Sequence, residues 1–245
     1  MHKKEIKGFI FGISSGFFYA LMMAFVKLSH QVSTENLIFF RNLICLALLL
    51  PVFIKKGNFI KTQKFGLQMI RASTGVITLY CFFAAAKYLL LVDVVLLFNT
   101  LPLFMPLVVL FWMKSKIPPK RSLAILCGFI GIILILKPGF NFSYWGFIIG
   151  LTAGLLGAIG HVAVRKLTPT DSAESILFYF FTTALLLFSS PAYKTWQPLT
   201  DNRMWLYIAL LGICAFLFQW LITKSYSYLP ATKVSCLIYF SVVFG

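Results

Sequence analysis

The sequence predicts an all-α protein that crosses the membrane many times and is built from two inverted five-helix repeats. Three observations lead to this fold class. Hydrophobic residues make up 60% of the 245 residues and charged residues only 11%, whereas about 25% of the residues of a soluble domain are charged. Apolar runs of membrane-spanning length follow one another along the chain. Landmarks of the first half of the sequence also recur, in the same order, in the second half.

A helix needs about 20 apolar residues to cross the hydrocarbon core of a bilayer. Eight runs come near this length, and the two shortest need an extra turn at each end. A ninth apolar stretch begins after Lys233 and stops at Gly245, so we expect the chain to end within a ninth span. The eight expected spans are, in order, 8–28, 36–54, 66–86, 92–113, 122–136, 146–164, 175–190 and 204–222.

Basic residues indicate the orientation of these spans. If the N-terminus is cytoplasmic, 15 of the 22 Lys and Arg residues fall in cytoplasmic segments, five in outer segments, and Arg41 and Arg71 inside spans. This distribution follows the positive-inside rule. Because the charges behind the net value of +16 lie in short segments between apolar runs, we expect a lipid bilayer as partner and no nucleic acid.

An internal repeat organises the spans. At an offset of 138 residues, the small residues of the first span recur in the sixth, at an offset of 139 Glu35 meets Glu174, and at 140 Tyr88-Leu89 meets Tyr228-Leu229. The small residues are Gly8, Gly12, Gly16 and Ala20, which recur as Gly146, Gly150, Gly154 and Ala158. Their four-residue spacing lets helix backbones approach closely.

The repeat divides the chain into residues 1–140, with spans 1–5, and 141–245, with spans 6–9 of an incomplete second copy. Five spans is an odd number, so the second copy must enter the membrane upside down. Inverted repeats are typical of alternating-access secondary transporters, which bind a small molecule near the midplane. A lipid or lipid-linked sugar translocator and an inactive truncated fragment stay open as alternatives.

Two arginines are the most informative candidates for binding this molecule, because a cation inside a span is costly unless it meets water or a partner. Arg41 lies about two turns inside its span, and we expect it to bind a carboxylate or phosphate of the substrate; a structural pair with Glu35 or a backbone carbonyl is the alternative. Arg71 lies nearer a span end, where snorkelling to the interface also explains it. The other polar or aromatic candidates are Asn42, Tyr80, Asn99, Thr100, His161, Tyr179, Gln219 and Trp220.

Asn99 and Thr100 precede Pro102 and Pro106, which can kink the fourth span and form a cavity wall. The mix of cations, amides and rings suits a small zwitterion, or an anion with a ring. All six acids lie in loops or at span ends, and His161 is the intramembrane group that titrates near neutral pH. We therefore expect exchange or facilitated uptake rather than proton symport.

Enzyme chemistry is not expected. The sequence has no H-E-x-x-H pattern and no intramembrane pair of aspartates. Its five cysteines lack metal-ligand spacing. No catalytic residue, metal or cofactor is therefore predicted.

Several segments carry a resemblance to a known family. They are Phe39-Phe40-Arg41, the stretch from Arg71 to Gly75, Lys87-Tyr88-Leu89, Pro102, the stretch from Gly128 to Gly131, and Leu136-Lys137-Pro138. On these residues the chain resembles the EamA-type transporters of the drug/metabolite transporter superfamily, and most closely the branch that includes S-adenosylmethionine uptake carriers. Where many relatives have a Gly-Glu or Asn-Glu pair after the fourth span, this sequence has Lys114-Ser115-Lys116.

The resemblance implies a ten-span fold, of which this chain lacks most of the ninth span and all of the tenth. It also implies a bacterial inner-membrane transporter of a small organic metabolite, such as S-adenosylmethionine or a similar amino-acid-like or nucleotide-like compound. Two copies could pair as a homodimer.

Overall fold

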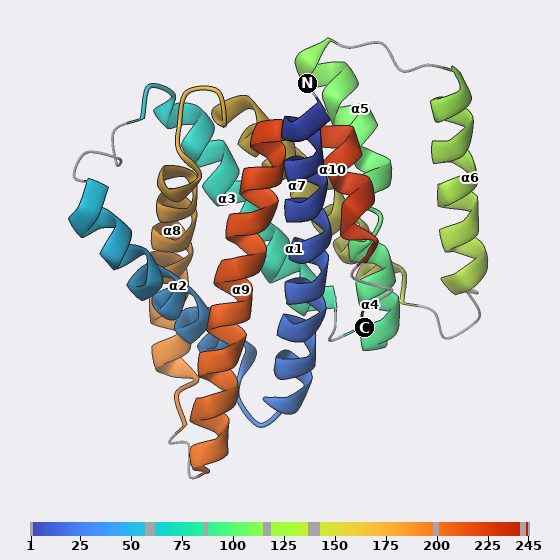
Figure 1. Ribbon diagram of the computed structural model, residues 1–245. Helices are drawn as coiled ribbons and strands as arrows, with labels where there is room; N and C mark the ends of the chain where they lie inside the picture. Colours follow the sequence, from blue (N-terminus) through green and yellow to red (C-terminus); the bar gives the residue numbers. More distant parts are fainter. Residues whose placement is uncertain are drawn as a thin grey trace. The chain divides into compact units, whose positions relative to one another are not determined.

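The computed structural model describes residues 2–56, 62–85, 88–114, 119–136, 143–197, 201–240 and 244. Within these residues the chain is helical, with no strand (Figure 1). The helices are α1 (His2–Leu28), α2 (Thr34–Lys56), α3 (Phe65–Ala85), α4 (Leu91–Phe98), α5 (Leu101–Met113), α6 (Pro119–Leu136), α7 (Tyr144–Leu167), α8 (Ala173–Lys194), α9 (Asn202–Tyr228) and α10 (Ala231–Ile238).

The helices agree with the expected spans. Six stretches among the described residues are long and apolar enough to cross a membrane: Lys3–Leu28, Thr34–Val52, Asp93–Met113, Tyr144–Leu167, Ala173–Lys194 and Asn202–Tyr228. The expected spans 66–86 and 122–136 form α3 and α6, and the ninth apolar stretch begins as α10, slightly before Lys233. The prediction of an all-α, multi-pass membrane protein is confirmed.

The predicted kink in the fourth span is also present. The expected span 92–113 is split into α4, which ends at Phe98, and α5, which begins at Leu101. Pro102 explains the position of the break, because a proline ring in a continuous helix would collide with the carbonyl four residues earlier, which is that of Phe98. At the break, the Thr100 backbone N–H and hydroxyl both donate to the Leu97 carbonyl, at 3.0 and 2.6 Å.

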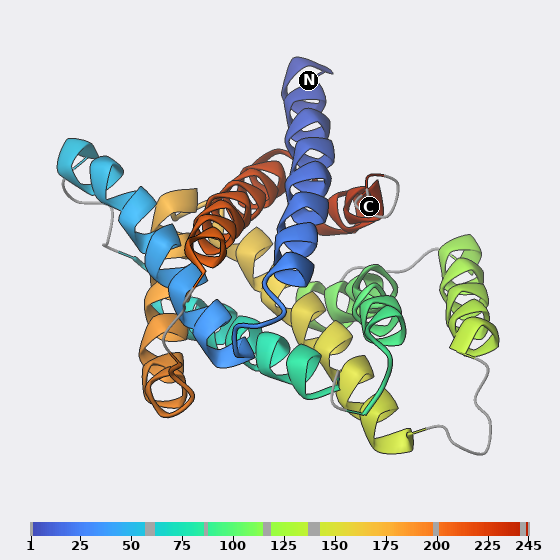
Figure 2. The same cartoon turned by 90° about the horizontal axis from the view of Figure 1, so that it is seen from below.

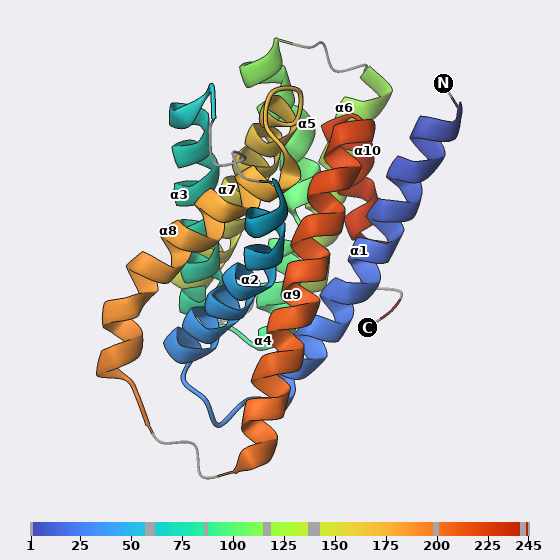
Figure 3. The same ribbon diagram turned by 60° about the vertical axis from the view of Figure 1, so that its left-hand side comes forward.

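The chain folds as two compact units. Unit 1 comprises Met1–Ser73 and Val164–Gly245, and unit 2 comprises Thr74–Ala163. In unit 1, α9 packs along α1 and α2, and α8 packs along α2 (Figures 1 and 3). Viewed from below, α9 and α10 flank α1 (Figure 2).

Glycines permit the close packing of α1 in unit 1. A Cβ atom added to Gly8 would lie 2.6 Å from Leu229 Cγ and 2.9 Å from Tyr228 Cβ, too near for any side chain other than hydrogen. One turn further, Gly12 faces Leu237 of α10 in the same way. The Ser225 hydroxyl donates to the Gly8 carbonyl at 2.8 Å, which adds a polar tie to this contact.

Unit 2 contains a matching contact on α7. A Cβ atom on Gly146 would lie 2.7 Å from Leu89 Cγ and 2.8 Å from Tyr88 Cβ, and one on Gly150 would lie 2.7 Å from Leu97 of α4. Gly8, Gly12, Gly146 and Gly150, which belong to the predicted small-residue faces, thus each leave room for a leucine side chain of a neighbouring segment.

Candidate functional site

Arg41 is a buried cation in the interior of unit 1. It lies in the third turn of α2, and only 7% of its surface is exposed. Its electrostatic neighbours are Tyr19 of α1 and Cys45, one turn further along α2. Among the described residues, Arg41 Nε has no hydrogen-bond partner. The alternative of an ion pair between Arg41 and Glu35 is not found, although the structure describes both residues.

Arg71 points into the same unit from α3 and is 4% exposed. Its Nη2 donates to Gln219 Oε1 of α9 at 3.2 Å, and its guanidinium carbon lies 4.2 Å from the centre of the Phe180 ring of α8. The snorkelling explanation is therefore wrong, because the side chain contacts two helices of the unit interior. Both of these partners are uncharged. Arg71 also lies within electrostatic range of Arg41, so two like charges share this interior.

Asn42 adds a fully buried amide beside Arg41 on α2. Its Nδ2 donates to the Ile38 carbonyl at 2.7 Å, while its Oδ1 has no hydrogen-bond partner among the described residues. A buried polar atom that lacks a partner is costly. Arg41 Nε and Asn42 Oδ1 therefore offer an unused donor and an unused acceptor on one helix.

Two buried acids lie on the α7–α8 side of unit 1. Glu174, in the first turn of α8, forms an ion pair with Lys224 Nζ at 3.1 Å and accepts from Trp220 Nε1 at 3.3 Å. Asp171 accepts from Gln68 Nε2 of α3 at 3.2 Å. Sequence reasoning placed the acids at span ends, which is correct, but it did not identify Glu174, Lys224 or Gln68 as members of a buried network. Only the three-dimensional pairing of α3, α8 and α9 brings them together.

The ten predicted residues divide between the units. Unit 1 holds Arg41, Asn42, Arg71, Tyr179, Gln219 and Trp220, and unit 2 holds Tyr80, Asn99, Thr100 and His161. Tyr179 is half-buried and packs edge-on against Phe65. Tyr80 is 64% exposed, on the outside of α3, and its part in ligand binding stays a prediction.

The other predicted residues of unit 2 are less exposed. Thr100 is buried and its hydroxyl is used at the helix break, whereas Asn99 and His161 are half-buried. Among the described residues, no group of three or more His, Cys, Asp or Glu side chains could hold a metal ion.

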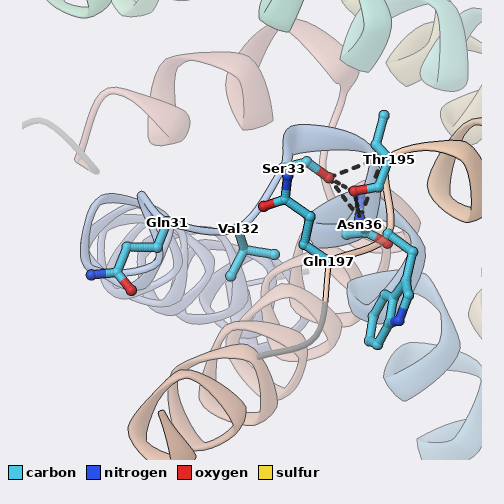
Figure 4. A pocket seen from close by; sticks show the side chains of 7 residues that line it. Gln31, Val32, Ser33, Asn36, Thr195 and Gln197 are labelled. Carbon is cyan, nitrogen blue, oxygen red and sulfur yellow. Dashed lines mark hydrogen bonds between the residues drawn. The ribbon is translucent and has the colours of Figure 1, made fainter. Parts of the chain in front are cut away.

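A small pocket lies at the end of unit 1 where the α1–α2 connection meets the end of α8 (Figure 4). Asn36 Nδ2 donates to Ser33 Oγ at 2.7 Å and to the Thr195 carbonyl at 3.1 Å, which ties the two segments together. The aromatic ring of Phe40, one turn along α2, contacts both Trp196 and Trp205. The pocket has room for roughly one water molecule. It is lined by Gln31, Val32, Ser33, Asn36, Thr195, Trp196 and Gln197.

Comparison with known families decides what kind of protein carries this interior. The model of the EamA-like transporter family matches residues 6–137 and 144–245. The chain belongs to this family. The resemblance seen in the sequence is thus confirmed at the level of the family.

Individual relatives of this EamA-like transporter are transporters too. A pseudopaline exporter of Pseudomonas aeruginosa is 26% identical over 243 residues, which cover 97% of this chain and 84% of the relative. A riboflavin transporter of Vibrio cholerae is 25% identical over 240 residues, which cover 94% of this chain and 79% of the relative. These relatives do not support the expected placement in the S-adenosylmethionine carrier branch. They do support a transporter of small molecules.

The fold of this EamA-like transporter is also found in a solved structure, described only as a crystal structure of a protein. The match has a TM-score of 0.69 at 18% identity, and it covers 100% of this chain and 90% of the other. At this identity the likeness shows the fold alone.

Proposed function

We propose that this EamA-like transporter carries a small organic molecule with a carboxylate or phosphate group, and that Arg41 binds that group. The observation that carries the proposal is the buried guanidinium of Arg41, whose Nε lacks a hydrogen-bond partner among the described residues. A charge in an apolar interior is costly until an opposite charge meets it. An anion supplied by the substrate removes that cost only while the substrate is bound.

The neighbours of Arg41 support an anion as ligand. Arg71 adds a second cation within electrostatic range, held by the neutral side chains of Gln219 and Phe180. Guanidinium groups match the geometry of carboxylate and phosphate with paired hydrogen bonds. At the 139-residue offset that places Glu35 on Glu174, Arg41 corresponds to Phe180, the ring on which Arg71 stacks. Arg71, which belongs to the first repeat, thus stacks on the residue of the second repeat that corresponds to Arg41.

Alternating access between two inverted repeats, residues 1–140 and 141–245, is the second part of the proposal. The two stretches matched by the family model start at residues 6 and 144, which lie 138 apart. The contact of Gly8 with Leu229 corresponds to that of Gly146 with Leu89, and the contact of Gly12 with Leu237 to that of Gly150 with Leu97. Five spans in the first repeat, an odd number, give the second copy the opposite orientation, which is the arrangement of many alternating-access carriers.

The substrate, location and assembly are proposed more specifically. We propose a secondary transporter of the bacterial inner membrane with a cytoplasmic N-terminus, as the basic residues favour. S-adenosylmethionine, or a similar amino-acid-like or nucleotide-like compound, is the substrate class to test first. We keep the homodimer as part of the proposal, to be tested by crosslinking in native membranes.

Binding of three related probes to the purified chain tests the anion site. 3-Indolepropionate carries a carboxylate, tryptamine an ammonium and tryptophan both, on the same ring. We expect the two carboxylates to raise the Tm of the wild type, and Arg41→Gln to weaken their binding roughly 10- to 100-fold, since a hydrogen bond to a charged group contributes about 1.5–3 kcal/mol. Tryptamine should respond little to this change.

Lys27→Gln is the matched control, because Lys27 is an exposed cation in the last turn of α1. It should bind the three probes as the wild type does. Carboxylate binding of the same strength in Arg41→Gln and the wild type would refute the anion site. Uptake of radiolabelled S-adenosylmethionine into proteoliposomes then tests the narrower substrate class.

A further inference from the structure

Glu174 is a buried carboxylate of unit 1 that pairs with the ammonium group of Lys224. Its side chain is 6% exposed, and its Oε1 lies 3.1 Å from Lys224 Nζ and accepts from Trp220 Nε1 at 3.3 Å. The same ammonium group lies 5.4 Å from the centre of the Trp220 ring. The cation is therefore bound by a carboxylate and by the face of an indole at once, which is the way that proteins bind alkylammonium ligands.

Further aromatic rings extend this environment. Phe11 of α1 meets Trp220 edge-on, with ring centres 6.5 Å apart, and it also packs against Tyr228, with centres 5.9 Å apart. Helices α1, α8 and α9 thus contribute an aromatic wall and one carboxylate. Aromatic walls of this kind are selective for organic cations over hydrated inorganic ones.

Lys224 occupies this environment through a flexible side chain. Its side chain is 27% exposed, far more than the 6% of Glu174, so the lysine reaches solvent while the carboxylate does not. A lysine stem has four rotatable carbons and can withdraw its ammonium group toward the surface. The carboxylate and the Trp220 ring belong to α8 and α9, and the hydrogen bond from Trp220 Nε1 to Glu174 Oε1 does not involve the lysine.

We propose that Glu174 and Trp220 form a subsite for a primary ammonium group of the transported molecule, and that Lys224 fills this subsite until the substrate displaces it. The exchange replaces one ammonium group by another, so the buried carboxylate keeps a cation in both states. Because one ammonium group takes the place of the other, Lys224 can leave the subsite without an uncompensated charge remaining inside the unit.

The ammonium subsite adjoins the anion site, and the inference rests on the proposed transport function for its substrate. Trp220 follows Gln219, the partner of Arg71, on α9. Glu174 and Phe180 are six residues apart on α8, which corresponds to about 9 Å of helix. The two subsites together are suited to a zwitterion whose ammonium and anionic groups lie several bonds apart.

Rescue by a free amine tests the subsite without the natural substrate. In the purified full chain in nanodiscs, Lys224→Met keeps the apolar stem but removes the ammonium group that pairs with Glu174, so its Tm should fall. Ethylammonium chloride at 100 mM should raise the Tm of this variant by about 3 °C above the value in 100 mM sodium chloride, because a ligand that binds only the folded state stabilises it. The wild type, with Lys224 in place, should respond less.

Glu174→Gln/Lys224→Met is the matched control, since it lacks the carboxylate and the lysine alike. It should show no difference between ethylammonium and sodium. An equal response in this double variant, or no response in Lys224→Met, would contradict the subsite and leave a permanent structural ion pair. If Lys224→Met does not fold, tryptamine binding to Glu174→Gln decides instead: it should be at least fivefold weaker than in the wild type, and unchanged binding overturns the inference.

Failure of this proposal and failure of the anion site can be told apart. Ethylammonium carries no anion, so Arg41→Gln/Lys224→Met should be rescued as well as Lys224→Met is. If Arg41→Gln binds carboxylates as the wild type does while ethylammonium still rescues Lys224→Met, only the anion site is refuted. If Arg41→Gln loses carboxylate binding but ethylammonium does not rescue Lys224→Met, only the ammonium subsite is refuted.

Discussion

Units 1 and 2 each contain a helix whose glycines admit leucine side chains from its neighbours, yet they differ in the charges that they bury. In unit 1, Gly8 and Gly12 of α1 receive Leu229 and Leu237, and in unit 2, Gly146 and Gly150 of α7 receive Leu89 and Leu97. Each glycine meets its leucine at a distance that a Cβ atom could not keep, so this type of contact is common to both units.

Buried polar side chains are distributed very differently. Arg41, Arg71, Asp171 and Glu174 are all buried in unit 1. Among the described residues of unit 2, the buried polar side chains are the neutral ones of Thr78 and Thr100. Helix packing of this kind needs only shape, whereas a site for a charged ligand needs charges. The comparison shows such packing in both units, while the buried charges lie in unit 1, where we propose that the ligand binds.

A cation placed in unit 2 should have the largest effect. Thr78 is 6% exposed in α3, and Thr78→Arg would bury a charge with no site built for it. We expect a loss of about 3 kcal/mol, the cost of an arginine at the centre of a membrane helix, and little protein recovered from the membrane fraction. Thr78→Val is the control and should accumulate normally. Normal accumulation of Thr78→Arg would remove the contrast between the units.

Valine at either glycine contact should have the next largest effect. Gly8→Val and Gly146→Val each push a branched side chain into a neighbouring leucine, and we expect each to lower stability by about 2 kcal/mol, as overpacking does. Thermal unfolding of the purified variants measures this loss. Gly131→Val is the matched control, because a Cβ atom at Gly131 meets nothing within 4 Å. A large loss at one contact alone would show that the two are not equivalent.

Removing the partner of Arg71 should have a smaller effect. Gln219→Leu deletes the acceptor that lies 3.2 Å from Arg71 Nη2. We expect a loss of about 1.5 kcal/mol, since a buried charged donor loses a hydrogen bond. Gln219→Leu should lower the Tm of the wild type but not that of Arg71→Met, in which the donor is already gone. The same fall in the wild type and in Arg71→Met would show that the two side chains are not coupled.

Arg41→Met should have the smallest effect on stability and the opposite sign. Replacing a buried charge by an apolar side chain of similar volume often stabilises a protein, here by about 1 kcal/mol. The same variant should lose carboxylate binding. Thermal unfolding and 3-indolepropionate binding on one preparation measure both quantities. A lower Tm would indicate that Arg41 stabilises the fold rather than binding a ligand.

Much of the fold could be predicted from the sequence. Apolar length and the four-residue spacing of small side chains are local properties, so the spans and the glycine faces are correct, and Pro102 located the break between α4 and α5. Membrane helices satisfy their backbone hydrogen bonds internally, which makes span positions readable from composition alone.

The site was predictable only in part. Arg41 and Arg71 stood out because a charge within an apolar run is rare. The direction in which Tyr80 points depends on which face of α3 meets other helices, and a run that is apolar on all sides does not reveal that face. Glu174 lay at the start of a span, where exposure is the usual expectation, and its burial depends on Lys224 and Trp220 from a helix almost fifty residues away.

Cysteine labelling from the two sides of the membrane tests most directly whether the two repeats have opposite orientations. In a chain whose five cysteines are replaced by serine, His30→Cys lies in the connection before α2 and Ser172→Cys in the matching connection before α8, and both positions are exposed. In intact cells, a membrane-impermeant maleimide should label His30→Cys, and should label Ser172→Cys only after the membrane is opened. Labelling of both cysteines from the same side would contradict the inverted repeat and, with it, alternating access.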